Sequence, residues 1–297
     1  MQGFLLINKP SGMTSFSVCS ALRRITGEKR IGHTGTLDPM ATGVLPVFIG
    51  RPTSLCDYLL CADKRYKARV RLGVATDTDD ITGNVIKQGK AVKDIEVIKQ
   101  VLNGFVGTQM QFPPIYSAIK KDGVALYKLA RKGEQVEITP REVTVHSITL
   151  LSDIYENGEF DIDVVCSKGT YIRSLCRDIG EKLGCFATLS KLERIKTGSF
   201  SVEECVPLDI LNAENIENYI LSAEYSLPHL REINVSEKQA VRFSNGGELS
   251  LERIKNDFNE DGETVKVFCN KIFLGLGKTD LSEKQLRVKC VLTQYVI

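Results

Sequence analysis

The sequence has no tryptophan and only three histidines, and none of its nine cysteines belongs to a Cys-x-x-Cys pair. Dispersed histidines and cysteines argue against a zinc site and against a disulfide framework. We therefore expect no metal and reduced, mostly buried thiols. No segment is apolar for long enough to span a bilayer, and the first residues lack a signal-peptide pattern. These absences predict a cytoplasmic protein without membrane contact.

Common cofactor and nucleophile motifs are also missing. The chain has no Gly-x-Gly-x-x-Gly fingerprint, no P-loop and no Gly-x-Ser-x-Gly elbow. The acidic stretch at 75–85 fails the calcium-loop pattern because Ile81 stands where a ligand is required, and we interpret it as a turn. Nothing in the sequence requires a cofactor, so none is expected.

Residues 30–50 place one carboxylate, Asp38, in a run rich in Gly, Thr and Pro, with no second acid until Asp57. Pro39 restricts Asp38 to extended conformations. Residues 20–73 carry ten Lys/Arg against four Asp/Glu, a local net charge of +6 in a chain with +2 overall. This excess favours an anionic partner such as nucleic acid, with a solvated charged face as the alternative. A lone carboxylate without a metal is typical of chemistry at an anomeric carbon.

Hydrophobic periodicity predicts an α+β protein. Helices are expected after a Thr14 or Ser15 cap, over 93–106, near 124–132, from a Thr53 cap to Leu60, and from a Thr170 cap to Gly184. Strict alternation predicts strands over 66–73, 143–151 and 160–166. In the first strand Tyr66 lies on the apolar face, and the opposite face is cationic.

Arg173 falls at the third position of the helix expected after Thr170. A cation there opposes the helix dipole, at a cost of a few tenths of a kcal/mol. This placement suggests a carboxylate partner or a bound anion, and an exposed arginine is the alternative. Near Pro228 the composition changes, and short strand-like pieces follow. We expect domains at 1–229 and 230–297, the second small and β-rich.

The resemblance to the bacterial TruB family of tRNA pseudouridine synthases rests on four segments, GHTGTLDPMATGVLPV (32–47), KRYKARVRLGVATDTDDITG (64–83), PPIYSAIKKDGVALYKLAR (113–131) and CSKGTYIRSLCRDIGEKLG (166–184). It implies the pseudouridine synthase fold, a mixed, mainly antiparallel sheet with flanking helices and loops. It also implies that the C-terminal part is a PUA-like RNA-binding domain.

The reaction that the resemblance implies is isomerisation of uridine 55 in the T loop of tRNA to pseudouridine, on a nucleotide flipped out of its stack. The N1–C1′ bond is broken and C5 is joined to C1′, so neither a redox cofactor nor an energy source is needed. The expected partner is the T stem-loop of tRNA, and the protein is expected to be a monomer.

Residue by residue, the resemblance implies that Asp38, Tyr66 and Arg173 are catalytic. Asp38 would act at the ribose, Tyr66 would stack on the uracil, and Arg173 would pair with Asp38. Substrate-binding positions implied by the family motifs are His33, Lys64, Tyr171 and Leu192. Glycines 32, 35 and 43 would let backbone and RNA approach closely, and residues 110–140 would form a flap.

Two other functions remain open from the sequence. The first is a non-catalytic RNA-binding protein that remodels tRNA folding. The second is a hydrolase of nucleosides or sugars that uses one carboxylate. Replacing Asp38 by Asn separates the first from an enzyme, and release of free uracil identifies the second.

Overall fold

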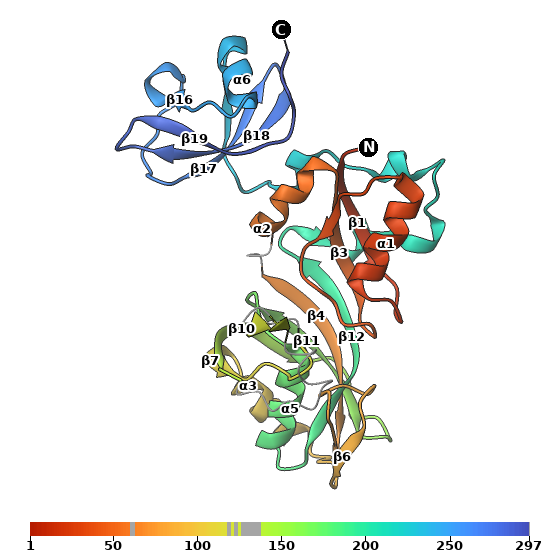
Figure 1. Ribbon diagram of the computed structural model, residues 1–297. Helices are drawn as coiled ribbons and strands as arrows, with labels where there is room; N and C mark the ends of the chain where they lie inside the picture. The colour runs from red at the N-terminus through yellow and green to blue at the C-terminus, as the bar shows by residue number, and fades with distance from the viewer. Residues whose placement is uncertain (60–62, 118–119, 122–123, 126–137, 297) are drawn as a thin grey trace.

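The computed structural model describes residues 1–297 except 60–62, 118–119, 122–123, 126–137 and 297. A ten-stranded sheet forms the centre of the first part, with the main strand order β14-β1-β3-β12-β4-β11-β10-β7, while β2 pairs with β3 and β13 with β12 (Figure 1). The β1–β14 and β3–β12 pairs are parallel and the other pairs are antiparallel. The predicted class, α+β with a mixed, mainly antiparallel sheet, is confirmed.

The strands of this sheet are β1 Gly3–Lys9, β2 Ile31–His33, β3 Thr42–Ile49, β4 Lys64–Leu72, β7 Gly107–Gln111, β10 Arg141–Leu150, β11 Glu159–Cys166, β12 Ala187–Thr197, β13 Phe200–Ser201 and β14 Val206–Pro207. Two hairpins stand apart from it, β5 Val74–Thr76 with β6 Val85–Gln88, and β8 Lys120–Lys121 with β9 Val124–Ala125. The described α-helices are α1 Ser15–Thr26, α2 Cys56–Leu59, α3 Ile95–Asn103, α5 Ile172–Lys182 and α6 Glu237–Ser244. Short 3₁₀ turns are η1 Arg51–Leu55, η2 Val202–Glu204, η3 Leu208–Ile210, η4 Ile216–Tyr219, η5 Ala223–Ser226 and η6 Leu251–Arg253.

The large sheet consists of two halves with separate apolar cores. One core lies among β4, β11, β12, α3 and α5, and the other among β1, β3 and α1. The halves join where β12 pairs in parallel with β3, in a register limited to Glu193–Thr42 and Arg194–Gly43. A site built at this junction can therefore draw side chains from both halves.

The predicted alternation of β4 is present, and two of the arginines on its cationic face pair with carboxylates of β11. Tyr66 is buried on the core side. On the other face Arg65 pairs with Asp163 at 2.9 Å, and Arg69 pairs with Asp161 at 2.7 Å. Part of the local positive charge is thus neutralised by the neighbouring strand β11.

Helix α1 begins after the predicted Thr14 cap, whose side chain accepts a hydrogen bond from Ser17 N. Two other predicted starts are wrong. Helix α5 has Tyr171 as its N-cap, because Thr170 Oγ1 donates instead to Ser167 O. The segment after Gly50 begins as a 3₁₀ turn two residues before Thr53, because Pro52 suits the first turn of a helix.

The short helix expected near 124–132 begins where β9 stands, and the rest of that range lies outside the described residues. Most of the expected flap at 110–140 also lies outside the described residues. The expected strands at 143–151 and 160–166 correspond to β10 and β11.

The C-terminal part forms its own five-stranded sheet, in the order β15-β17-β18-β19-β16 (Figure 1). Its strands are β15 Glu232–Asn234, β16 Leu249–Ser250, β17 Thr264–Cys269, β18 Ile272–Asp280 and β19 Gln285–Val291. The predicted β-rich C-terminal part is confirmed. Apolar residues of this sheet share one cluster with residues of β1 and β3 in the first part. From the sheet come Phe268, Phe273 and Leu276, and from β1 and β3 come Phe4, Leu6, Val44 and Phe48.

None of the described helices has both the length and the apolar character needed to cross a membrane.

Candidate active site

The loop that carries Asp38 follows β2 and forms hydrogen bonds with Lys9 and Ser15. Ser15 Oγ accepts a hydrogen bond from Leu37 N at 3.0 Å. The fully buried Lys9 donates from Nζ to Pro39 O at 3.2 Å and to two further backbone carbonyls at 2.6 and 2.7 Å. Burial lowers the pKa of Lys9 to about 8. These contacts hold the residues on both sides of Asp38.

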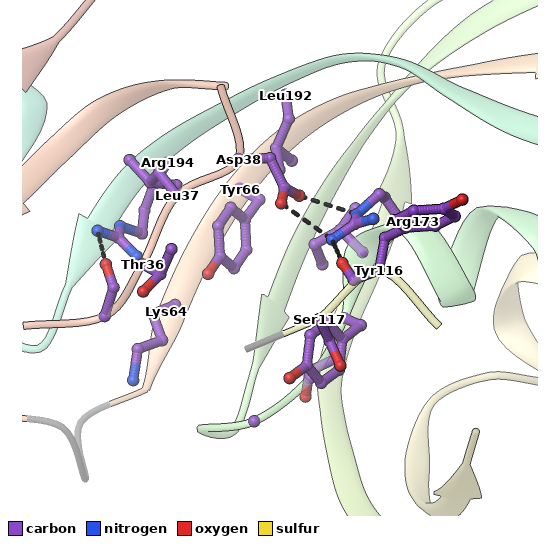
Figure 2. A pocket seen from close by; sticks show the side chains of 15 residues that line it. Thr36, Leu37, Asp38, Lys64, Tyr66, Tyr116, Ser117, Arg173, Leu192 and Arg194 are labelled. Atoms are coloured by element: carbon purple, nitrogen blue, oxygen red, sulfur yellow. Dashed lines mark hydrogen bonds and ion pairs between the residues drawn. The ribbon is translucent and has the colours of Figure 1, made fainter. Parts of the chain in front are cut away.

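Arg173, the second residue of α5, faces Asp38 (Figure 2). Its Nη2 donates to Asp38 Oδ1 at 2.9 Å, and its Nε lies 2.9 Å from Oδ2 in an ion pair that lacks hydrogen-bond geometry. Nη2 also donates to Tyr116 O at 3.0 Å, and Nη1 donates to Thr78 O at 3.1 Å and lies 3.8 Å from Asp80 Oδ2. The cation at the start of α5 thus has carboxylate partners that offset its unfavourable position in the helix dipole.

The charge state of Asp38 is set by opposing effects. Burial raises the pKa of this carboxyl group above its usual value, and the charge of Arg173 lowers it. Asp80 adds a smaller raising effect, and Lys9 a small lowering one. The pKa stays above the usual value, so ionised Asp38 depends on its pairing with Arg173.

A cavity of about 290 Å³ lies over this pair. Six of the seven residues proposed from the sequence line it: Asp38, Lys64, Tyr66, Tyr171, Arg173 and Leu192. Its size is near the lower end of ligand sites, which begin at about 300 Å³. The cavity therefore suits one nucleobase and its sugar better than a large cofactor.

His33 is the exception among the predicted site residues. It lies at the end of β2 and does not line the cavity. Its Nδ1 is buried without a hydrogen-bond partner among the described residues, and burial lowers the pKa of its imidazole. We expect a neutral His33 beside the cavity at neutral pH.

The described residues contain no group of three or more His, Cys, Asp or Glu side chains placed to hold a metal ion. The eight described cysteines are free.

Comparison with known proteins decides the family. The model of the TruB family pseudouridylate synthase N-terminal domain matches residues 23–172, and the model of the tRNA pseudouridylate synthase B C-terminal domain matches 173–233. The chain belongs to the TruB family of pseudouridylate synthases. The predicted family and the predicted enzyme class, an isomerase, are confirmed.

Curated members of the TruB family match almost the whole chain. The tRNA pseudouridine synthase B of Clostridium perfringens strain 13 is 43% identical and covers 99% of this chain and 100% of its own length. That of Clostridium tetani strain Massachusetts is 42% identical and covers 94% of this chain and 96% of its own. Among solved structures, an H/ACA RNP bound to a substrate RNA containing 2′-deoxyuridine has a chain with TM-score 0.73 and 25% identity, covering 98% of this chain and 85% of that one. A chain of a Cbf5-Nop10-Gar1 complex has a TM-score of 0.72 and 27% identity, and the match covers 99% of this chain and 85% of that one.

Sequence reasoning missed several residues that lie at this site in the TruB-family fold. The turn between β5 and β6, interpreted as structural, brings Asp80 and the carbonyl group of Thr78 to Arg173. Tyr116 and Arg194 also line the cavity. The three aspartates in a short turn gave a signal for Asp80, because such a cluster suggests a cationic partner elsewhere in the fold.

Two of the three glycines expected to approach RNA also pack closely against the protein itself. Gly35 and Gly43 have φ values of 71° and 98°, which favour glycine. A Cβ atom on Gly43 would lie 2.2 Å from Arg194 O, and one on Gly35 would lie 3.2 Å from Arg194 Nη1. Close approach to Arg194 thus gives both glycines a reason within the protein, and their expected approach to RNA stays a prediction.

Proposed function

We propose that this protein converts uridine 55 in the T loop of tRNA to pseudouridine, with Asp38 as the catalytic carboxylate acting on a flipped-out nucleotide. The observation that supports this most strongly is the pairing of Asp38 with the buried Arg173 at the edge of a small cavity. The tRNA specificity is supported by the names of the curated relatives.

In the proposed reaction the N1–C1′ bond breaks and its electron pair leaves with the uracil. After the base turns, C5 forms a bond to C1′, the C5 proton is lost, and N1 gains a proton, so atoms and electrons balance within one nucleotide. Asp38 faces the ribose as an ionised carboxylate, since Arg173 opposes the effect of burial on its pKa. Arg173 also fixes the direction of the carboxylate, and accurate placement is worth several kcal/mol in catalysis.

The remaining cavity residues suit a nucleobase that has left its stack in the RNA. Tyr66 is buried on the wall of the cavity and offers a ring face for stacking on the uracil, while Leu192 offers an apolar contact. Flipping the target nucleotide costs a few kcal/mol, which contacts of this kind offset. We infer that Lys64 and Tyr171 contact the same nucleotide, and that His33 lies against the RNA beside it.

We further propose that residues 1–229 form the catalytic domain and residues 230–297 a PUA-like RNA-binding domain, that the protein acts as a monomer, and that it works in the cytoplasm, where tRNA is processed. The family models divide the chain between residues 172 and 173, and the second model ends at residue 233. No cofactor enters the proposed reaction.

The direct test uses tRNA that carries tritium at C5 of its uridines. The wild-type protein should release tritium and leave pseudouridine at position 55, and Asp38→Asn should lower the rate at least about 10⁴-fold with tRNA binding retained. Asp57→Asn is the matched control, since Asp57 lies in α2 away from the cavity lining. Unchanged tritium release by Asp38→Asn refutes the role of Asp38, and free uracil in the wild-type reaction indicates a hydrolase instead.

A further inference from the structure

We propose that Gln111 is a positioning residue whose carboxamide group fixes the start of α5, and with it the guanidinium group of Arg173 that pairs with Asp38. The effect on reaction rate rests on the proposed function, whereas the effect on the placement of Arg173 does not. Gln111 is the last residue of β7, and it is not among the described residues that line the cavity. It therefore acts on the site through another residue.

The side chain of Gln111 binds the backbone of Tyr171 at two atoms. Its Nε2 donates to Tyr171 O at 3.1 Å, and its Oε1 accepts from Tyr171 N at 2.8 Å. Because a carboxamide group donates at one atom and accepts at the other, both bonds form in only one orientation of the side chain. Gln111 is also buried, so solvent does not readily replace either bond. The peptide groups on both sides of the Tyr171 Cα atom are therefore held from β7.

Tyr171 is the residue at which α5 begins. It is the N-cap of the helix, in an extended conformation, and its own side chain does not cap the helix. Its carbonyl group accepts a hydrogen bond of the first helical turn, from Leu175 N at 3.0 Å, in addition to the bond from Gln111. Arg173 is the second residue of the helix, so a movement of the Tyr171 backbone displaces Arg173 directly.

The chain that leaves β7 is attached to the same end of α5 by further bonds. Ser174 Oγ and Arg177 Nη2 donate to Phe112 O at 2.8 and 3.1 Å. Arg173 Nη2 donates to Tyr116 O at 3.0 Å, beside its bond to the carboxylate (Figure 2). These bonds keep α5 on the chain after β7 when the carboxamide group is removed. We therefore expect a variant without this group to fold, with the first turn of α5 displaced.

A small displacement of α5 is enough to change the pairing of Arg173 with Asp38. Arg173 Nη2 lies 2.9 Å from Asp38 Oδ1, and a separation greater by about 0.7 Å is no longer a hydrogen bond. The carboxylate would then lose the contact that fixes its direction. In the proposed reaction a misplacement of about 1 Å costs roughly 100-fold in rate.

The kinetic test is a double-mutant cycle under single-turnover conditions with tRNA. Gln111→Ala should lower the rate by about 100-fold, with the Kd for tRNA changed less than about threefold. In an Arg173→Gln background, where the guanidinium group is absent, the same substitution should cost less than about tenfold. Gln109→Ala is the matched control, because Gln109 lies in the same strand and its Nε2 donates to Phe105 O at 2.9 Å. Equal losses from Gln111→Ala in both backgrounds overturn the proposal.

A second readout does not depend on activity. With ¹⁵N in the arginine side chains, the NMR signal of Arg173 Nε is the one lost in Arg173→Gln, and it should shift in Gln111→Ala but not in Gln109→Ala. If Gln111→Ala does not fold, Gln111→Met replaces it, since methionine is unbranched and fills the space without an amide donor. If the wild-type protein forms no pseudouridine but Gln111→Ala shows this shift, the proposed function is refuted and the placement of Arg173 by Gln111 is supported. An unshifted Arg173 signal overturns that placement.

Discussion

Asp38 lies in a place that disfavours its charged form. Burial and Asp80 raise the pKa of its carboxyl group, and Arg173 is the strongest of the groups that lower it. The sequence predicted Asp38 from its surroundings and Arg173 from its costly position near a helix start. It did not predict the role of Asp80, because the cluster of aspartates in that turn does not indicate which cation, almost a hundred residues away, lies beside it.

The activity of the protein should depend on pH through Asp38. Since its folded pKa lies above the usual value, the ionised form is lost on acidification at a higher pH than for an exposed aspartate. Arg173→Gln removes the main lowering effect, so the pKa rises further and the acid limb of the rate profile moves to higher pH. We expect a rate loss of at least about 100-fold at neutral pH. Single-turnover rates from about pH 5 to about pH 8 check this, and an acid limb at the wild-type position contradicts it.

Arg194 shows what strand alternation can and cannot predict at the residue scale. Leu192 and Arg194 are two residues apart in β12, so they share a face, and that face was expected to be apolar at Leu192. The alternation therefore contained a signal that Arg194 is buried. The carbonyl groups of Gly35 and Val44, which accept hydrogen bonds from its guanidinium group, were not predictable, because they depend on which strand pairs with β12.

At the scale of elements, the short parallel contact between β3 and β12 decides where the site forms. Strands β4, β10 and β11 were predicted from alternation, and helices α1 and α3 from apolar spacing, whereas β3 and β12 were not predicted. The order of the strands in the sheet was not predictable, because the sequence carries no local sign of which strand edges pair. The acidic turn between β5 and β6 was correctly interpreted as a turn, and its contact with Arg173 through Thr78 and Asp80 appeared only in the fold.

Gly43→Ala tests this contact between elements. The residue has a φ of 98°, and a Cβ atom would lie 2.2 Å from Arg194 O, so β3 and β12 would have to separate. Backbone strain alone costs about 1–3 kcal/mol in the free energy of unfolding, and we expect Gly43→Ala to lose more than this, measured by urea denaturation. Gly12→Ala is the control, because its φ is also positive, at 83°, but a Cβ atom there meets no atom within 4 Å. Equal losses in the two variants would show that backbone strain alone, and not the β3–β12 contact, explains the effect.

At the scale of the whole molecule, the C-terminal sheet shares its apolar packing with the first part. Phe268 and Phe273 stack with ring centroids 5.2 Å apart within the cluster that also contains Phe4 and Phe48. The sequence predicted a separate β-rich unit from the change near Pro228, and it gave no sign of this shared cluster. Deleting residues 230–297 would expose apolar surface of the first part, so a change in KM after deletion would not report lost RNA contacts alone.

Leu276→Ala tests whether the two parts are coupled. Leu276 is fully buried in the shared cluster, and its truncation should cost about 2–5 kcal/mol. Hydrogen exchange should then show weaker protection in β1 and β3 as well as in β18. Ile272→Ala in the same strand is the control, because Ile272 is 43% exposed and should change stability by less than about 0.5 kcal/mol. Loss of protection confined to β18 contradicts the coupling.

The shared cluster has a consequence for which RNAs can be accepted. Because apolar residues of the C-terminal sheet share one cluster with residues of β1 and β3, moving the sheet away would expose apolar surface, and we expect its separation from the Asp38 cavity to vary little. An RNA that touches both places must present its target uridine at that one spacing from its second point of contact. Among RNAs with similar loops, the protein would then select by the length of the stem between the target uridine and the second point of contact, before any base is recognised.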